Sequence, residues 1–317
     1  MVANRMHLIR YPQNNPLRRH NNLINHSCIT IGNFDGVHLG HQALIAQVVK
    51  KAQLSGRQSV VVSMQPLPTQ FFHDTDAVEV LTPFKHKFQL LQAMGVDVMC
   101  LLNFNQKLAN MPAVDFYQRI ICEGLQAKHI LVGDDFRFGV NRKGDFSMLS
   151  QLALKDDVEV VQSDSVMVDE QRVSSTIIRK YLNQGDFVTV KQMLGRDFNL
   201  LGRVAHGKKI GRTIGYPTIN IELKGGAFPL HGIYVVEIKI SGKLYPAVAS
   251  VGFNPSVGGN AKRIEVYVLD FNQDVYGQSV EVLFYKKLRN EVEFDSLKLL
   301  TSAIEKDVQF TRNFFDK

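Results

Sequence analysis

The stretch TIGNFDGVHLGHQALI, residues Thr30–Ile45, places three glycines and two histidines between an apolar run and a helical pattern. A strand that leads through a glycine-containing loop into a helix brings backbone N–H groups and the positive end of a helix dipole to the edge of a sheet. His38 and His41 are three residues apart, so both side chains project to the same side of the helix start. The segment therefore predicts an anion site where two imidazoles can hydrogen-bond phosphoryl oxygens.

Other interpretations of these histidines stay open on the residues alone. Both could be surface or capping residues, which is the commoner fate of a single histidine. Metal ligation is disfavoured because the sequence has no further His/Cys cluster to supply the three or four ligands that zinc takes. A GxGxxG pattern is also absent, so the sequence lacks a dinucleotide fingerprint of the Rossmann type.

Length and composition favour a cytoplasmic protein with two domains. A chain of 317 residues suits two domains, and its 45% hydrophobic and 21% charged residues are ordinary for a globular protein. It has no apolar run of the ~18 residues that a membrane helix needs. Cys28, Cys100 and Cys122 form no CxxC pair, which suggests reduced core thiols. The net charge of +7 is spread along the chain, which fits small polyanionic ligands and does not predict a nucleic-acid partner.

The first half alternates apolar, β-branched runs with helical patterns. The helical patterns at 41–56 and 83–95 end at Gly56 and Gly95. This rhythm predicts an α/β domain over residues 1–182, with a Rossmann-like parallel sheet that binds ligands at the carboxyl ends of its strands. The expected strands are CITIG (28–32), SVVVSM (59–64), VDVMCLL (96–102), HILVG (129–133) and VEVVQ (158–162).

The second half changes character after about Gln184. The stretch 172–195 is helical and polar, which suggests a closing helix and then a connector. From Leu200 onward, short strand patterns and turn residues follow closely, with ISGK (240–243) as a hairpin turn. Residues 186–317 are therefore expected to form a small antiparallel β-barrel with a C-terminal helix packed on it. The expected inner face of that helix carries Phe294, Leu297, Leu300, Ile304 and Val308.

Three motifs of the first half resemble one enzyme family. GNFDGVHLGH is similar to the GxFDGxHxGH signature of the FAD synthetase branch of the nucleotidyltransferases, and GDDFRFG (133–139) and VSSTIIR (173–179) resemble its later motifs in the same order. Taken singly, GDDFRFG could be a turn with two packed phenylalanines, and SSTIIR could be a helix N-cap. One departure is Met64, in SMQPLPTQFF, where the family commonly has Phe.

This resemblance implies an adenylyltransferase that holds ATP at the helix start and forms no covalent enzyme intermediate. Ser175 and Arg179 stand one helical turn apart, where a hydroxyl and a guanidinium can share a phosphate. The implied catalytic residues are His38, His41 and Arg179. The implied ATP-binding residues are Gly32, Asn33, Phe34, Asp35, Gly40, Ser175 and Thr176, and those lining the flavin or nucleotide are Asp135, Phe136 and Phe138.

The second half resembles a kinase. GRVAHGKK (202–209) nearly matches a P-loop, but Lys209 replaces the hydroxyl residue and a strand pattern follows instead of a helix, so the P-loop interpretation fails. Residues 207–220 instead resemble the riboflavin kinase signature GxxxGRxxGxPTxN. Departures stand at Ser250 and Ser256, in SVGFNPSV, where the family often has NIGxxPT.

The kinase resemblance implies a role for each matching residue. Thr218 and Asn220 would hold Mg²⁺ together with ATP, through the hard oxygen ligands that this ion accepts. Glu265 would be the catalytic base, and Arg289 would lie on the flavin side. The implied flap over ATP comprises Gly207, Lys208, Gly211, Arg212 and Gly215.

Together the two resemblances cover nearly the whole chain, in the order found in the bifunctional riboflavin kinase/FAD synthetases of prokaryotes. The implied reactions are riboflavin + ATP to FMN + ADP in the C-terminal domain and FMN + ATP to FAD + pyrophosphate in the N-terminal domain. Expected partners are ATP, riboflavin and FMN, with no nucleic acid and no membrane, in a monomer or weak homo-oligomer. Two rival hypotheses are that only one module is active, or that the protein is a non-catalytic flavin-binding regulator.

Overall fold

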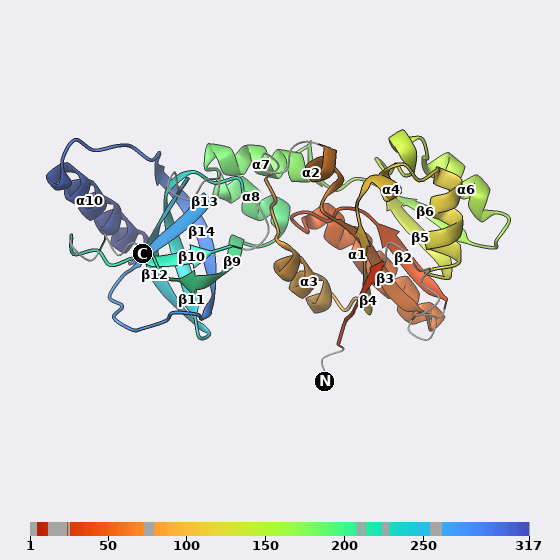
Figure 1. Cartoon of the computed structure of the whole chain (residues 1–317), viewed down its shortest axis with the longest axis horizontal. Helices are drawn as coiled ribbons and strands as arrows, with labels where there is room; N and C mark the ends of the chain where they lie inside the picture. Colours follow the sequence, from red (N-terminus) through yellow and green to blue (C-terminus); the bar gives the residue numbers. More distant parts are fainter. Residues whose placement is uncertain are drawn as a thin grey trace. The chain divides into compact units, whose positions relative to one another are not determined.

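The chain divides into two compact units (Figure 1). The first unit comprises Met1–Ala77 and Lys87–Val173, and the second comprises Val78–His86 and Ser174–Lys317. The computed structural model describes residues 5–11, 24, 26–72, 79–207, 211, 214–223, 228–253 and 262–316. The predicted site residues Lys208 and Arg212 and the departure at Ser256 lie outside the described residues.

The first unit is built on a six-stranded, fully parallel sheet with the order β1-β4-β3-β2-β5-β6. This confirms the predicted α/β class and all five expected strands. From β2 the chain proceeds outward through β3 and β4 and then crosses to β5 on the other side of β2, so the switch point lies between β2 and β5. The strands are β1 (His7–Tyr11), β2 (Ser27–Ile31), β3 (Gln58–Gln65), β4 (Val98–Asn103), β5 (Ala127–Gly133) and β6 (Glu159–Ser163).

Helices cover this sheet because its central strands bury almost every side chain. All five residues of β2 are buried, as expected for a parallel strand with both faces covered. The long helix α1 (Leu39–Ser55) packs on β2 and β3 and ends at Gly56 in the left-handed conformation, as predicted. The other elements are α2 (Pro68–Phe72), α4 (Gln106–Ala109), α5 (Ala113–Phe116), the π-helix η3 (Tyr117–Cys122), the 3₁₀-helix η4 (Val140–Arg142), α6 (Phe146–Ala153), β7 (Met167–Val168) and β8 (Gln171–Arg172).

The second unit contains a closed antiparallel barrel with the order β10-β13-β12-β11-β14-β9, which confirms the predicted architecture. The predicted turn at ISGK joins β11 to β12 through Ser241 and Gly242, both with positive φ. Helix α10 (Leu297–Phe315) lies along the outside of the barrel and contacts β12 (Figure 1). The expected inner face is wrong at its start, because Phe294 precedes the helix and Leu297 is 66% exposed. The strands are β9 (Phe198–Ala205), β10 (Ile219–Glu222), β11 (Gly232–Ile240), β12 (Lys243–Phe253), β13 (Lys262–Val268) and β14 (Ser279–Arg289).

The chain is helical on both sides of the predicted domain boundary. Helix α7 (Ser175–Gln184) ends at Gly185, and α8 (Phe187–Leu194) follows directly. The expected polar connector is therefore a packed helix, because α8 buries Phe187 against the aromatic rings of Tyr234 and Phe284 in the barrel. The compact units also differ from the predicted domain limits of 182 and 186, since α7 groups with α8 and the barrel.

The segment before Lys87 also belongs to the second unit, and it carries a buried histidine. The His86 Nε2 atom lies 3.4 Å from the side-chain nitrogen of Asn199 on β9, and that nitrogen donates to Glu281 on β14. Burial, and then the nearby charge of Arg196, lower the pKa of His86 from 6.5 to about 4. This histidine is therefore neutral in the folded protein at neutral pH.

A stability prediction follows from the pKa of His86. Because the unfolded side chain titrates near 6.5 and the folded one near 4, the unfolded chain binds more protons between these values, and stability falls as the pH falls. We expect wild type to lose about 2 kcal/mol of unfolding free energy from this group between pH 7 and pH 5. Urea unfolding of His86→Gln should lack this loss, whereas His7→Gln, which changes an exposed histidine, should keep it. An unaltered pH dependence in His86→Gln would contradict the assignment.

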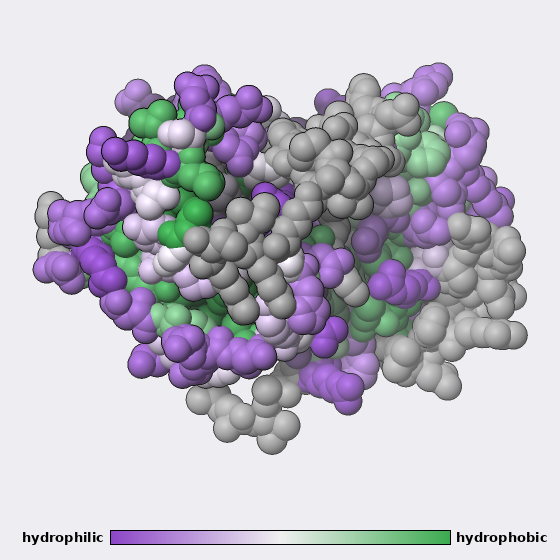
Figure 2. Space-filling view, turned by 60° about the vertical axis from the view of Figure 1, so that its left-hand side comes forward, coloured by the Kyte–Doolittle hydropathy of each residue, from purple (hydrophilic) through white to green (hydrophobic). Residues whose placement is uncertain are grey.

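The described part of the chain has no helix long and apolar enough to cross a membrane. On the face drawn in Figure 2, hydrophobic side chains reach the surface between hydrophilic ones. Large apolar side chains that are exposed are distributed over several elements, among them Leu54 on α1, Val188 on α8 and Leu299 on α10. Exposed apolar residues of this kind are normal on a protein surface.

Candidate active sites

The loop after β2 lies at the switch point of the sheet and is packed tightly into it. Phe34, Asp35 and Val37 are at most 2% exposed. Phe34 and Val37 have φ values of 48° and 41°, a left-handed conformation that is rare for bulky or β-branched residues. Such strain persists only where surrounding contacts fix the backbone, and it is common at functional sites. The predicted ATP-binding loop is therefore closely packed at the carboxyl end of β2.

The two histidines of this loop contact each other at the start of α1. His38 is the N-cap, and its Nδ1 atom accepts a hydrogen bond from the backbone N–H of His41. Nδ1 is therefore unprotonated, which leaves the proton of His38 on Nε2. The two imidazole rings stack with centroids 3.6 Å apart, and the ring of Phe34 meets His41 edge-on at 5.1 Å. The structure thus brings His38, His41 and Phe34 together at the start of α1.

His41 is held in its neutral form. Burial, and then the neighbouring His38 and Lys87, hold its pKa well below 6.5. Among the described residues, the buried Nδ1 atom of His41 has no hydrogen-bond partner. A neutral imidazole with an unsatisfied nitrogen at a helix N-terminus is suited to a hydrogen bond with a phosphoryl group.

Lys87 is a residue of this site that the sequence motifs missed. It lies on α3 (Phe84–Ala93), is 5% exposed, and its ammonium group donates to the carbonyl oxygen of Asn33 at 2.6 Å. Burial lowers its pKa from 10.5 to about 8, and Asp35 opposes this shift. One sequence signal could have found it: Lys87 stands four residues before the fully buried Leu91, so the helical period places a lysine on the buried face.

The GDDFRFG motif follows β5, the strand beside β2, but its phenylalanines are core residues. Phe136 and Phe138 stack at 5.4 Å and belong to the main apolar core of the unit. Asp135 is exposed, and its neighbour Asp134 accepts hydrogen bonds from Ser165 and Arg172. The interpretation of GDDFRFG as a turn with two packed phenylalanines therefore describes Phe136 and Phe138 well. Their contact with a nucleotide stays a prediction. Met64 on β3 packs on the same core.

The VSSTIIR motif begins helix α7 in the second unit. Ser174 is the N-cap, and Ser175 and Thr176 occupy the first turn. The Arg179 Nε atom donates to the backbone carbonyl of Glu79 at 2.7 Å, within the same unit. The N-cap interpretation is therefore correct for Ser174. The approach of Ser175, Thr176 and Arg179 to the histidines of the first unit stays a prediction.

Three of the predicted kinase residues, Asn220, Glu265 and Arg289, stand in one row on the outer face of the barrel. Asn220 on β10 pairs with Glu265 on β13, and Glu265 pairs with Ser250 on β12. Ser250 pairs with Ile233 on β11, which in turn pairs with Arg289 on β14. Paired residues of neighbouring strands point to the same face. The barrel register thus collects Asn220, Glu265 and Arg289, which lie far apart in the sequence.

Each end of this row is fixed by a neighbouring element. At one end, a Cβ atom at Gly207 would overlap the side-chain amide of Asn220, so only glycine permits this close approach. At the other end, Arg289 makes a bidentate ion pair with the buried Asp307 of α10, with a shortest distance of 2.8 Å. The Arg289 guanidinium also lies 5.6 Å from the ring centroid of Phe294.

Glu265 is partly accessible in the middle of the row. Its side chain is 26% exposed and forms an ion pair with Arg263 at 3.3 Å. Its neighbours Ile264 and Val266 are fully buried in the barrel, so strand alternation directs Glu265 to the outer face. Ser250 lies within 3.5 Å of Glu291, a second carboxylate that the motifs did not indicate. Thr218 and Gly215 precede β10, and Gly211 accepts a backbone hydrogen bond from Tyr216.

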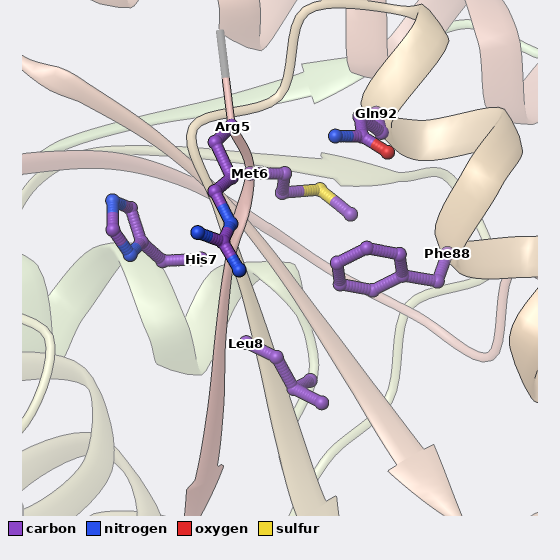
Figure 3. A pocket seen from close by; sticks show the side chains of 6 residues that line it. All are labelled: Arg5, Met6, His7, Leu8, Phe88 and Gln92. Carbon is purple, nitrogen blue, oxygen red and sulfur yellow. The ribbon is translucent and has the colours of Figure 1, made fainter.

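A separate pocket lies at the amino-terminal end of the edge strand β1, whereas the loop after β2 lies at the carboxyl ends of the strands. Its volume is about 470 Å³. Figure 3 shows Met6 directed toward Phe88 of α3, whereas His7 points to the other side of the strand. The other lining residues are Arg5, His7, Leu8 and Gln92. None of the predicted site residues lines this pocket.

An α/β unit with imidazoles at a helix N-terminus, together with a barrel that carries asparagine, glutamate and arginine in one row, defines a nucleotide-dependent transferase with two modules. The FAD synthetase family profile matches residues 20–177, and the riboflavin kinase profile matches residues 194–315. The chain belongs to the family of bifunctional riboflavin kinases/FMN adenylyltransferases. It therefore has both activities of that family.

Relatives of this family are similar over most of the chain. The bifunctional riboflavin kinase/FMN adenylyltransferase of Pseudomonas fluorescens is 42% identical over 89% of this chain and 91% of its own length. That of Haemophilus influenzae is 37% identical over 95% of this chain and 98% of its own length. A crystal structure named as a macrolide-efflux protein from Streptococcus pneumoniae is 31% identical, with a TM-score of 0.81, and covers 96% of this chain and 99% of that one.

Proposed function

We propose that adenylyl transfer takes place at the carboxyl end of β2, in a domain of residues 1–182, and riboflavin phosphorylation on the outer barrel face, in a domain of residues 186–317. The FAD synthetase profile extends into α7, so the proposed catalytic domain and the compact unit end at different residues. The observation that carries the proposal is the pair of stacked imidazoles at the N-terminus of α1.

Adenylyl transfer needs no base, because the phosphate of FMN is already an anionic nucleophile. This phosphate attacks the α-phosphorus of ATP, and pyrophosphate leaves. The task of the protein is to orient the reactants and to stabilise charge that builds on the phosphoryl oxygens. We assign the donor roles to Nε2–H of His38, to His41 and to the backbone N–H groups at the start of α1. Ser175, Thr176 and Arg179 complete the ATP site in this proposal.

Riboflavin phosphorylation differs because its nucleophile is a neutral hydroxyl. Glu265 accepts the proton of the ribityl hydroxyl as that oxygen attacks the γ-phosphorus of ATP, and ADP leaves. Arg289 lies on the flavin side, and Gly207, Gly211 and Gly215 belong to the flap over ATP, together with Lys208 and Arg212.

Two oxygen donors, Asn220 in the row and Thr218 just before β10, fit Mg²⁺. Thr218 and Asn220 supply neutral oxygen ligands, of the kind that Mg²⁺ accepts alongside nucleotide phosphates. Asn220 stands beside the carboxylate of Glu265 in the barrel register and is approached closely by Gly207. When bound there with ATP, Mg²⁺ supplies positive charge to the phosphates.

One incubation separates this proposal from its rivals. Purified protein with riboflavin, ATP and Mg²⁺ should first form FMN and then FAD, resolved by chromatography. FMN without FAD, or FAD only from added FMN, would show that a single module is active. Binding of flavin without either product would support a regulator. The stacked histidine pair and the row around Glu265 favour catalysis, because a binding protein needs no groups directed at a transition state.

The cellular location, oligomeric state and partners of the enzyme are also open to proposal. We propose that it acts in the cytoplasm, as a monomer or weak homo-oligomer, with ATP, riboflavin and FMN as its partners and without nucleic acid or membrane. Gel filtration with light scattering at several protein concentrations tests the oligomeric state.

A further inference from the structure

A buried lysine next to the adenylyltransferase loop has no role in the motifs. Lys87 is 5% exposed on α3, and its ammonium group donates to the Asn33 carbonyl oxygen at 2.6 Å. The hydroxyl of Ser63 on β3 donates to the same oxygen at 3.2 Å. Two neighbouring elements thus hold one carbonyl group of the loop. Burying a charged group without partners costs folding free energy, so a buried lysine is expected to have hydrogen-bond or charge partners.

The residue after this carbonyl is the strained part of the loop. Phe34 follows Asn33 directly, has a φ of 48°, and places its ring edge-on to His41. His41 in turn stacks on His38. A rotation of the peptide between Asn33 and Phe34 would therefore move the ring that abuts the imidazole pair. The contacts run from Lys87 through Asn33 and Phe34 to the two histidines.

The positive charge of Lys87 also interacts with Asp35 and with His41. Asp35, which is 2% exposed, is the carboxylate that favours the charged form of this lysine. In the other direction, burial is the main cause of the low pKa of His41, and the positive charge of Lys87 lowers it further. Lys87 thus contacts the loop through a hydrogen bond, and its charge lowers the pKa of His41.

We propose that Lys87 is a positioning residue for adenylyl transfer, which fixes the loop of residues 32–38 through the Asn33 carbonyl and so sets the placement of His38 and His41. The inference rests on the proposal that these histidines hold the phosphates of ATP. It adds a residue from α3 to a site otherwise assigned to β2, α1 and α7.

The test compares Lys87→Met, Lys87→Arg and Lys85→Met, an exposed lysine two residues earlier on the chain. We expect Lys87→Met to lower kcat for FAD formation about 10-fold, because the histidines are misplaced in the transition state. KM for ATP should change less than kcat, and Lys87→Arg should recover part of the rate. Riboflavin phosphorylation by each variant, and both reactions of Lys85→Met, should stay at wild-type rates.

A second measurement, the pKa of His41, would not change if Lys87 had only a structural role. In NMR spectra of histidine-labelled protein, the pKa of His41 should rise in Lys87→Met and stay low in Lys87→Arg, because only the former removes the charge. If Lys87→Met does not fold, Lys87→Gln takes its place, since it keeps a donor but loses the charge. Unchanged kcat and an unchanged His41 titration would overturn the inference.

The parallel variant His41→Ala separates this inference from the proposed site. If His41→Ala loses FAD formation and Lys87→Met keeps it, the role of Lys87 is wrong and the site stands. If both variants keep wild-type FAD formation, the phosphate site itself is wrong. Equal losses of FAD and FMN formation in Lys87→Met would show a general folding defect and would also overturn the positioning role.

Discussion

Replacing Glu265 by glutamine is expected to lower FMN formation by about 10²-fold or more, with FAD formation from supplied FMN unaffected. The ribityl hydroxyl is a poor nucleophile near neutral pH, so its proton must pass to a positioned base. Glutamine keeps the shape and the place of Glu265 in the row with Asn220 and Ser250, but it removes the basicity. The measurement is the initial rate of riboflavin phosphorylation at saturating ATP.

The control for this variant is Glu222→Gln, which removes an exposed carboxylate from the end of the same strand as Asn220. It should phosphorylate riboflavin at the wild-type rate. If Glu265→Gln also does so, Glu265 is not the base and the proton leaves by another route. A loss in both variants would instead indicate that negative charge on the barrel surface matters in general.

The second large effect is expected for His41→Ala, which should stop FAD formation while FMN accumulates. Alanine removes an imidazole that is neutral, stacked on His38 and without a hydrogen-bond partner for its buried Nδ1 among the described residues. By analogy with the loss of one donor from an oxyanion site, the cost is ~2.7 to 4 kcal/mol, or about 10²- to 10³-fold in rate. Chromatography of products formed from riboflavin and ATP would show this as FMN without FAD.

His7→Ala provides the matched control, because His7 is an exposed histidine on the edge strand of the same unit. It should produce FAD as wild type does. FAD formation by His41→Ala at the wild-type rate would refute the assignment of its imidazole to the ATP phosphates. Arg179→Ala should also lower FAD formation, but mainly through a higher KM for ATP.

Local patterns predicted most of the fold. The strands of the sheet and the barrel follow from apolar runs between turn residues, and α1 ends where Gly56 supplies a left-handed residue. Strand β1 was missed because it is an edge strand with one buried side chain, Ile9, and so has no continuous apolar run. The π-helical turn after α5 and the packed face of α8 were missed for a different reason, since tertiary contacts decide both.

The sequence predicted the site residues as separate motifs, but only the structure shows how they are arranged in space. Sequence order could not show that Asn220, Glu265 and Arg289 share one row, because the register of the barrel sets that row. Nor could it show that Phe136 and Phe138 stack in the core. Lys87 carries no motif, and its role depends on a contact with Asn33 across 54 residues.

The grouping of Val78–His86 with the barrel has a consequence for protein synthesis. His86 and its neighbour Asn199 are 113 residues apart, so at about 5–20 residues per second the ribosome needs roughly 6 to 23 s between them. During that interval the segment has left the ribosome before the strand it packs on exists. Val80 and Leu81, which are buried in the finished protein, then stay in water or on a chaperone. The second unit thus completes its folding only after translation has passed the barrel, whereas the sheet of the first unit can form while the ribosome is still at work.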